Sequence, residues 1–298
     1  MLQGYQLLTG IPCILVNDAD AAVAAEVWAA GSKQAYMHAE NIAMITLGTG
    51  IGVGLVLNNR LYQGSFGCVE AGHMIVDTSS SASQCGCGQR GCVETFASAE
   101  NLSKSYHAML AAFASGSSAS ADESKHDLRA QSACPAPLPE ELSDVSKALT
   151  GGSRYVFEIA MQYPKSLAAD MLDNACKQIA VLCINLCRVI DPQVIIIGGG
   201  MSKAGNPLLE RVSSHVRAAT WTVLPTDVEL VIAQGMENSG TIGAALAAKN
   251  YAMSRSMLPD IGAMSASRGK EGQLVQHAMW VAPVLCAGLG YALASRKK

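Results

Sequence analysis

The feature of this sequence that most constrains its fold is a run in which three cysteines alternate with glycines. The run reads C-G-C-G-Q-R-G-C over residues 85–92, and a histidine lies shortly before it. Three thiols and one imidazole complete the tetrahedral ligand set of a structural zinc ion, and the glycines let the backbone turn tightly around it. We therefore predict a closed zinc site at His73, Cys85, Cys87 and Cys92, with free or oxidised thiols as the alternative.

Composition excludes some classes of protein. The 298 residues carry a formal net charge of −3, so no broad basic surface for nucleic acid is expected. Half of the residues are hydrophobic, which is typical of a folded globular protein. Ten cysteines without a signal-like N-terminus indicate a reducing compartment, and we expect a cytoplasmic protein.

Hydrophobic patterns predict alternating strands and helices. The predicted strands are 13–16, 42–46, 53–57, 194–197 and 228–233, and the predicted helices are 19–30, 166–190 and 241–249. This alternation is typical of an α/β architecture. Cys176, Cys183 and Cys187 fall on one face of the long helix, where we expect them to pack in the core.

Polar residues and glycines follow several of these strands. Asn17 and Asp18 either place ligand-binding groups at a strand end or simply cap the following helix. Two glycine clusters follow strands, where backbone N–H groups can face phosphate oxygens, although each alone is as consistent with a tight turn. The clusters are Gly48, Thr49, Gly50 and Gly52, and Gly198, Gly199 and Gly200.

Two carboxylates flank the cysteine run. Glu70 lies just before His73, and Glu94 lies just after Cys92. A folded metal knot would hold both rigidly, as hydrogen-bond acceptors for sugar hydroxyls must be held. Solvated surface glutamates are the alternative.

Two segments lack the α/β pattern. Residues 114–150 are rich in Ala, Ser and Pro at their start, and we expect a flexible insertion. Residues 251–298 form a C-terminal extension in which 274–294 carry no charged residue. That length is close to the ~20 residues that span a bilayer, so 274–294 are a candidate membrane anchor. An extension that packs or stays disordered is the alternative.

Taken together, these segments resemble the ROK family of sugar kinases and repressors. The resemblance extends from residue 10 to about residue 249, apart from the insertion, and the chain is most similar to glucokinases and then to N-acetylmannosamine kinases. It is carried by N-D-A-D at 17–20, L-G-T-G-I-G at 47–52, E-A-G-H at 70–73, the cysteine run with the V-E that follows it, I-G-G-G-M-S at 197–202 and G-T-I-G-A-A at 240–245.

The resemblance implies an actin-like ATPase (ribonuclease H-like) fold with nucleotide in a cleft between two lobes. It assigns Asp18 as the general base and places the 48–52 turn at the phosphates and residues 198–200 against the adenosine. It implies ATP, Mg²⁺ and structural Zn²⁺ as cofactors, a hexose as substrate and a homodimer for the full kinase. The implied sugar-binding residues are Asn17, Asp18, Glu70, His73 and Glu94.

The sequence departs from the family in two places. Full ROK kinases begin with an Asp-x-Gly-Gly-Thr turn that holds the nucleotide phosphates and magnesium, and this sequence contains no such turn. We therefore interpret residues 1–16 as a remnant of the N-terminal lobe and 17–250 as the large lobe, and expect little kinase activity from the chain alone. Asp20 also replaces the final asparagine of the family's N-D-A-N pattern.

The sequence alone leaves three functions open. The first is phosphorylation of a hexose, above all glucose to glucose 6-phosphate. The second is non-enzymatic sugar binding, as in ROK repressors. The third is an inactive interaction protein held at a membrane by residues 274–294. The presence of Asp18 favours the kinase.

Overall fold

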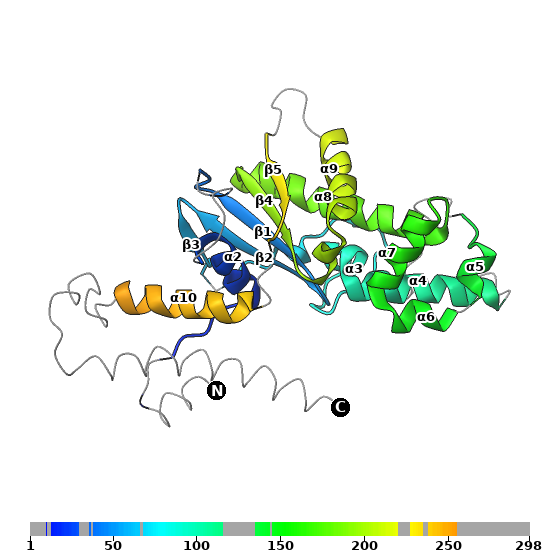
Figure 1. The fold of residues 1–298 in the computed structure, drawn as a ribbon, viewed down its shortest axis with the longest axis horizontal. Helices are drawn as coiled ribbons and strands as arrows, with labels where there is room; N and C mark the ends of the chain where they lie inside the picture. The colour runs from blue at the N-terminus through cyan, green and yellow to red at the C-terminus, as the bar shows by residue number, and fades with distance from the viewer. Residues whose placement is uncertain are drawn as a thin grey trace.

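The protein is built around a mixed β-sheet. The computed structural model describes residues 10, 13–29, 36, 38–65, 68–115, 135–143, 145–219, 227–234 and 238–254. Within them the sheet has five strands in the order β3-β2-β1-β4-β5 (Figure 1). These are β1 (Ile42–Leu47), β2 (Ile51–Leu57), β3 (Arg60–Tyr62), β4 (Val194–Gly198) and β5 (Glu229–Ile232).

Strand pairing brings both glycine clusters to the same end of the sheet, where β1 and β4 finish. β1 and β2 form the predicted antiparallel hairpin, with Leu47 opposite Ile51. β4 lies parallel to β1 with Gly198 opposite Thr46, and β5 continues the parallel part. The residues that follow β1 and those that follow β4 therefore lie side by side, although they are far apart in the sequence.

Helices cover both faces of the sheet. Ile42 and Met44 of β1 pack with α2 (Asp18–Trp28), against which α10 (Ser239–Ser254) lies (Figure 1). Ala43, Ile45 and Leu47 face the larger core on the other side. Because both faces are covered, β1 is apolar on both, as buried parallel strands are. The helices of the larger core are α3 (Val93–Ala97), α4 (Ala99–Ala114), α7 (Gly152–Gln162), α8 (Leu167–Ile190) and α9 (Asn206–Ala218).

The longest helix in the described part of the chain, α8, confirms the predicted helix 166–190. Ser166 caps its start, because its hydroxyl accepts a hydrogen bond from the N–H of Ala169 at 3.1 Å. Asp191 adopts a left-handed conformation (φ 45°) at its end, and Pro192 follows. Cys176, Cys183 and Cys187 are buried, so their predicted role in the core is also confirmed.

The predicted strand at 13–16 is not formed. These residues are described without strand pairing, and the Leu15 side chain is 83% exposed. An extended segment becomes a strand only when a neighbour pairs with its backbone groups, and the described sheet ends at β3 on one side and β5 on the other. The predicted helix after it is present as α2.

The predicted flexible insertion at 114–150 is too long at its C-terminal end. Residues 116–134 lie outside the described part of the chain, but α5 (Pro139–Leu142) and α6 (Val145–Thr150) are helical. The buried Glu141 carboxylate accepts hydrogen bonds from the N–H groups of Leu138, Leu167 and Ala168 and from the hydroxyl of Tyr106, at 2.7–3.2 Å. This carboxylate ties α5 to α4 and α8, so the segment is fixed to the core.

The candidate anchor at 274–294 lies outside the described residues and stays a prediction. Among the helices that the structure describes, none is both long enough and apolar enough to cross a membrane.

Candidate functional site

The start of α2 presents two polar side chains of different character. The Asn17 side chain is the helix cap, because its Oδ1 accepts from the N–H groups of Ala19 and Asp20 at 2.9 and 3.4 Å. Asn17 therefore does cap the helix, and it does so through Oδ1. Asp18 is exposed, and its Oδ1 accepts from the Ala19 N–H at 2.8 Å. The exposed carboxylate is held at a fixed helix end and is open to a ligand.

Close packing fixes α2 in place. A side chain on Gly54 of β2 would put its Cβ 2.4 Å from the Ala19 carbonyl oxygen. A side chain on Gly243 of α10 would put its Cβ 1.7 Å from the Ala21 carbonyl oxygen. Only glycine permits these approaches, so the strand and the neighbouring helix hold the first turn of α2 from two directions.

Asp20 lies beneath this exposed end. Its side chain is fully buried, Oδ2 accepts from Gln63 Nε2 at 3.3 Å, and Oδ1 has no hydrogen-bond partner among the described residues. Burial raises the pKa of Asp20 to about 6, and the nearby carboxylates of Asp18 and Glu70 add to the rise, while the Gln63 hydrogen bond opposes it. The fold therefore gathers three carboxyl groups, two from α2 and one from the segment before His73.

The predicted metal ligands come together. One ligand atom each from His73, Cys85, Cys87 and Cys92 lies within 4.8 Å of every other. The Cys87 and Cys92 sulfurs are 3.6 Å apart, and Cys85 Sγ is 3.5 Å from His73 Nδ1. A disulfide needs about 2.05 Å, so these two thiols are not bonded.

The spacing fits a tetrahedral ion. Zinc bonds of about 2.3 Å to sulfur and about 2.0–2.1 Å to nitrogen place tetrahedral sulfurs about 3.8 Å apart, and sulfur about 3.5 Å from nitrogen. The sulfur–sulfur distance of 3.6 Å and the sulfur–nitrogen distance of 3.5 Å agree with these values. Burial raises the pKa of Cys92 to about 12 and also raises that of Cys85, whereas hydrogen bonding from the Gln89 backbone lowers the pKa of the exposed Cys87. Metal binding at this cluster would therefore release protons.

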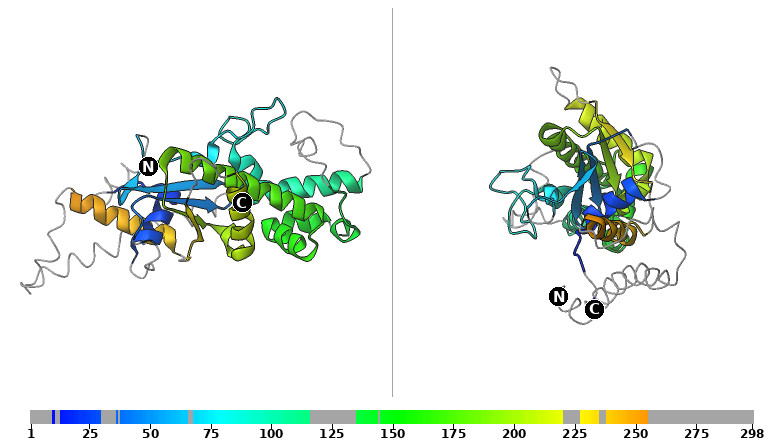
Figure 2. Two further views of the ribbon diagram at one scale, coloured as in Figure 1. Left: turned by 90° about the horizontal axis from the view of Figure 1, so that it is seen from above. Right: turned by 90° about the vertical axis from the view of Figure 1, so that its left-hand side faces the viewer.

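Backbone contacts shape the loop that carries the cysteines. The Cys85 N–H donates to the Gln89 carbonyl at 2.8 Å, and the Arg90 guanidinium donates to the Ala82 carbonyl at 2.8 Å. Gly91 has a positive φ of 74°, and a Cβ there would lie 1.9 Å from the Asp77 carbonyl oxygen. This segment protrudes to one side of the sheet (Figure 2). Local hydrogen bonds therefore preform the ligand cluster.

Glu70 and His73 approach the cluster from a short helical turn. Both lie at η2 (Ala71–His73), with Glu70 as its N-cap residue. The Nδ1 atom of His73 faces Cys85, and Nε2 lies 3.9 Å from Glu70 Oε2. Glu70 Oε1 accepts from the Cys68 thiol at 3.2 Å, a contact that sequence reasoning missed.

Glu94 links the cluster to the glycine-rich hairpin turn. Its Oε2 accepts from the Ile51 N–H at 2.9 Å, and its Oε1 lies 3.7 Å from Cys85 Sγ. The side chain is partly buried with these two contacts, so the interpretation of Glu94 as a solvated surface residue is wrong. We call residues 48–52, the hairpin turn together with the first two residues of β2, the glycine turn from here on.

The second glycine cluster lies beside the glycine turn. Gly199 has a positive φ of 84°, and a Cβ there would lie 2.5 Å from the Leu47 carbonyl oxygen, at the end of β1. Gly200 opens η4 (Gly200–Ala204). The two glycine clusters predicted from sequence therefore lie side by side at the ends of β1 and β4.

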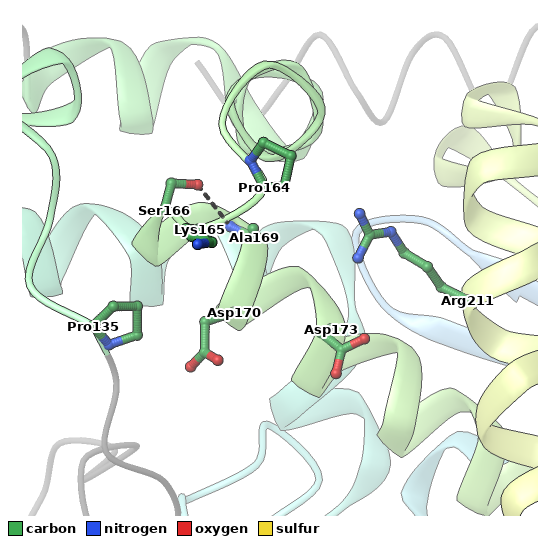
Figure 3. A pocket seen from close by; sticks show the side chains of 8 residues that line it. All are labelled: Pro135, Pro164, Lys165, Ser166, Ala169, Asp170, Asp173 and Arg211. Atoms are coloured by element: carbon green, nitrogen blue, oxygen red, sulfur yellow. Dashed lines mark hydrogen bonds between the residues drawn. The ribbon is translucent and has the colours of Figure 1, made fainter.

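A polar hollow of about 370 Å³ lies apart from these residues (Figure 3). The N–H groups of Leu167, Ala168 and Ala169, at the start of α8, already donate to Glu141 and Ser166, so that helix end offers little to an anion. No residue of the predicted site is among those that line the hollow, which are Pro135, Pro164, Lys165, Ser166, Ala169, Asp170, Asp173 and Arg211.

Known proteins resemble this chain. A glucokinase of Halalkalibacterium halodurans is 31% identical over 236 residues, which cover 79% of this chain and 63% of the glucokinase. An N-acetylmannosamine kinase of Vibrio cholerae is 29% identical over 219 residues, covering 73% of this chain and 60% of the kinase. The chain thus spans somewhat less than two-thirds of the length of these relatives.

A solved structure agrees with the fold. The ROK family glucokinase of Streptomyces griseus, in complex with glucose and AMPPNP, matches with a TM-score of 0.59 and 26% identity over 81% of this chain and 70% of that protein. The predicted actin-like ATPase fold is thereby confirmed. The ROK family itself matches residues 5–251, well over half of the sequence, and the chain belongs to this family.

Proposed function

We propose that residues 17–250 form the large lobe of an ATP-dependent hexose kinase, with glucose as the preferred sugar and N-acetylmannosamine as the alternative. One observation carries the proposal: the glycine turn lies against the start of α2, where a Cβ on Gly52 would be 2.9 Å from the Cβ of Ala19, and Glu94 joins the same turn to the metal-ligand cluster that includes His73. The similarity to glucokinases and N-acetylmannosamine kinases supports it.

In the reaction we infer, Asp18 is the general base. The sugar hydroxyl attacks the γ-phosphorus of ATP, its proton passes to the Asp18 carboxylate, and the bond from phosphorus to ADP breaks as the new O–P bond forms. The exposure of Asp18 leaves it open to substrate, and the Asn17 cap fixes the helix end that carries it. A positioned base supplies about 10²–10⁴ in rate.

The sugar would be held by Asn17, Glu70, His73 and Glu94 together with Asp18. His73 suits a double role, because Nδ1 faces the cysteines while Nε2 faces Glu70. Glu70 Oε2 and His73 Nε2 could then share neighbouring hydroxyls of one ring. Carboxylates suit this task, since hydrogen bonds to charged groups are the stronger ones.

The nucleotide would lie along the end of the sheet where the two glycine clusters meet. The Gly48 N–H donates to the Gly50 carbonyl at 3.0 Å and Gly52 pairs with Thr46 in the hairpin, so these two residues would shape the turn while the N–H groups of Thr49 and Gly50 face the phosphates. Residues 198–200 would lie against the adenosine. Mg²⁺ bound to the phosphates would supply neutralising charge, the main need of phosphoryl transfer besides alignment.

We assign the four-residue cluster to structural zinc. His73, Cys85, Cys87 and Cys92 complete the four ligands of such a site, so no coordination position is left open for catalysis. No disulfide joins the described cysteines, which fits a cytoplasmic location, and the family resemblance favours a homodimer for the full kinase.

Calorimetric titration of the chain with glucose and with N-acetylmannosamine tests the sugar site. Wild type and Asp18→Asn should bind one of these sugars with similar affinity, because the base acts chiefly in the chemical step. Glu70→Ala should weaken the same binding at least tenfold. Glu100→Gln, on the exposed face of α4, is the matched control and should bind like wild type.

Two results would count against the proposal. Absence of binding for both sugars would contradict the hexose site. Equal weakening by Asp18→Asn and Glu70→Ala would contradict their separate roles. Sugar binding without phosphorylation by a two-lobed protein would instead favour the sugar-sensing alternative.

A further inference from the structure

The glycine turn is attached to the segment that leaves the metal-ligand cluster. The Ile51 N–H donates to Glu94 Oε2 at 2.9 Å, and the Gly48 carbonyl accepts from the Ala99 N–H at 2.9 Å. Glu94 lies in α3, directly after the last ligand Cys92, and Ala99 is the first residue of α4, which follows α3. The turn is therefore fastened at two points to the consecutive helices that leave the cluster.

Glu94 is itself held from the cluster side. Cys92 is the N-cap residue of α3, and Glu94 stands in the first turn of that helix. The Glu94 carbonyl accepts from Asn101 Nδ2 at 2.9 Å and from the Ser98 N–H at 3.2 Å, and Oε1 lies 3.7 Å from Cys85 Sγ. Glu94 is thus joined to two of the metal ligands, Cys92 through the helix cap and Cys85 through its sulfur.

The turn is shaped around this carboxylate. A Cβ on Gly50 would lie 2.5 Å from Glu94 Oε2, so a side chain there would displace the acid or the turn. Gly50 and Ile51 thus contact the same atom, Glu94 Oε2: Gly50 leaves room for it, and the Ile51 N–H donates to it. A residue whose sole role was to face a sugar would need neither.

We propose that Glu94 is a positioning residue that couples the metal-ligand cluster to the glycine turn, so that metal loading sets the conformation of the turn and with it the affinity for nucleotide. The effect on nucleotide affinity rests on the proposed function, which places ATP phosphates at the turn. The coupling itself rests on the contacts of Ile51, Gly50 and Cys85 with Glu94.

Hydrogen exchange of the Ile51 amide, followed by NMR, tests the coupling without any catalytic readout. Glu94→Ala should raise the exchange rate at Ile51 by about tenfold or more, the loss expected for a hydrogen bond to a charged acceptor. Glu94→Gln keeps an acceptor oxygen and should stay within about threefold of wild type. Glu158→Gln, which changes an exposed carboxylate of α7 away from the cluster, is the control and should leave Ile51 unchanged.

Metal removal is the second arm and needs no change at Glu94. In wild type, a chelator should raise exchange at Ile51, and Cys87→Ser, at the exposed ligand, should do the same. Neither treatment should add to the effect of Glu94→Ala. Unchanged exchange at Ile51 in Glu94→Ala, or after metal removal from wild type, would overturn the proposal.

Titration with AMPPNP in the absence of sugar separates this inference from the proposed function. Glu94→Ala should bind the analogue at least fivefold more weakly than wild type, and Glu94→Gln within about twofold. Equal affinity of wild type and Glu94→Ala would overturn the effect on nucleotide. Failure of wild type itself to bind AMPPNP would contradict the proposed function, while the exchange data would still decide the coupling.

Discussion

Replacing Asp20 by asparagine should change how stability depends on pH. Asp20 is fully buried with one oxygen unpartnered, and its pKa is raised from 3.8 to about 6. Because the folded pKa lies above the unfolded one, this carboxyl costs no stability below about pH 3.8. The cost grows as pH rises and is complete above about pH 6.

The magnitude follows from the two pKa values. A shift from 3.8 to about 6 corresponds to about 3 kcal/mol lost at pH 8. About 1.6 kcal/mol of this is already lost at pH 5, so the wild-type free energy of unfolding should fall by about 1.4 kcal/mol more than that of Asp20→Asn between pH 5 and pH 8. Taking the change between two pH values cancels any fixed cost of burying the amide.

Urea unfolding at pH 5 and pH 8 measures this difference, with equal slopes required for the comparison. Glu100→Gln removes an exposed carboxylate and provides the control. A wild-type and an Asp20→Asn protein whose stabilities change in parallel across this pH range, within about 0.3 kcal/mol, would refute the argument that Asp20 is buried at a cost.

Three further predictions address the cluster, the core and the base. Purified protein should contain about one zinc per chain by elemental analysis, and Cys87→Ser should lose most of it; zinc retained in that variant would exclude Cys87 as a ligand. Glu141→Gln should lower the free energy of unfolding by about 2–4 kcal/mol in urea, since four donors lose a charged acceptor; a loss under about 0.5 kcal/mol would contradict that role. Asp18→Asn should reduce sugar phosphorylation by at least about 10²-fold in a two-lobed protein without weakening sugar binding, and a smaller loss of turnover would argue for another base.

Patterns that depend on near neighbours in the sequence were predictable. The limits of α8 follow from Ser166 and Asp191-Pro192, and the β1–β2 hairpin follows from its glycines. The cluster of His73 with the cysteines was also predictable, because zinc ligands sit at short, recognisable spacings and the loop between Cys85 and Cys92 closes on itself through local hydrogen bonds.

Contacts between distant residues were not predictable from one sequence. The Ile51 backbone donor to Glu94 and the donors that gather on Glu141 leave no local pattern, because a backbone N–H is the same at every residue but proline. The apolar run at 13–16 shows the opposite error, since strand-like residues do not by themselves supply a pairing partner. β3, with only three residues, was too short to detect.

Formation of a sugar phosphate tests the central claim most directly. The chain joined to the lobe of a ROK glucokinase that carries the Asp-x-Gly-Gly-Thr turn should convert glucose and ATP to glucose 6-phosphate and ADP, as followed by ³¹P NMR of the product. The same joined protein with Asp18→Asn should form product at least about 10²-fold more slowly. No phosphorylation of glucose or N-acetylmannosamine by a folded, zinc-containing protein of this kind would contradict the assignment of the site to a hexose kinase.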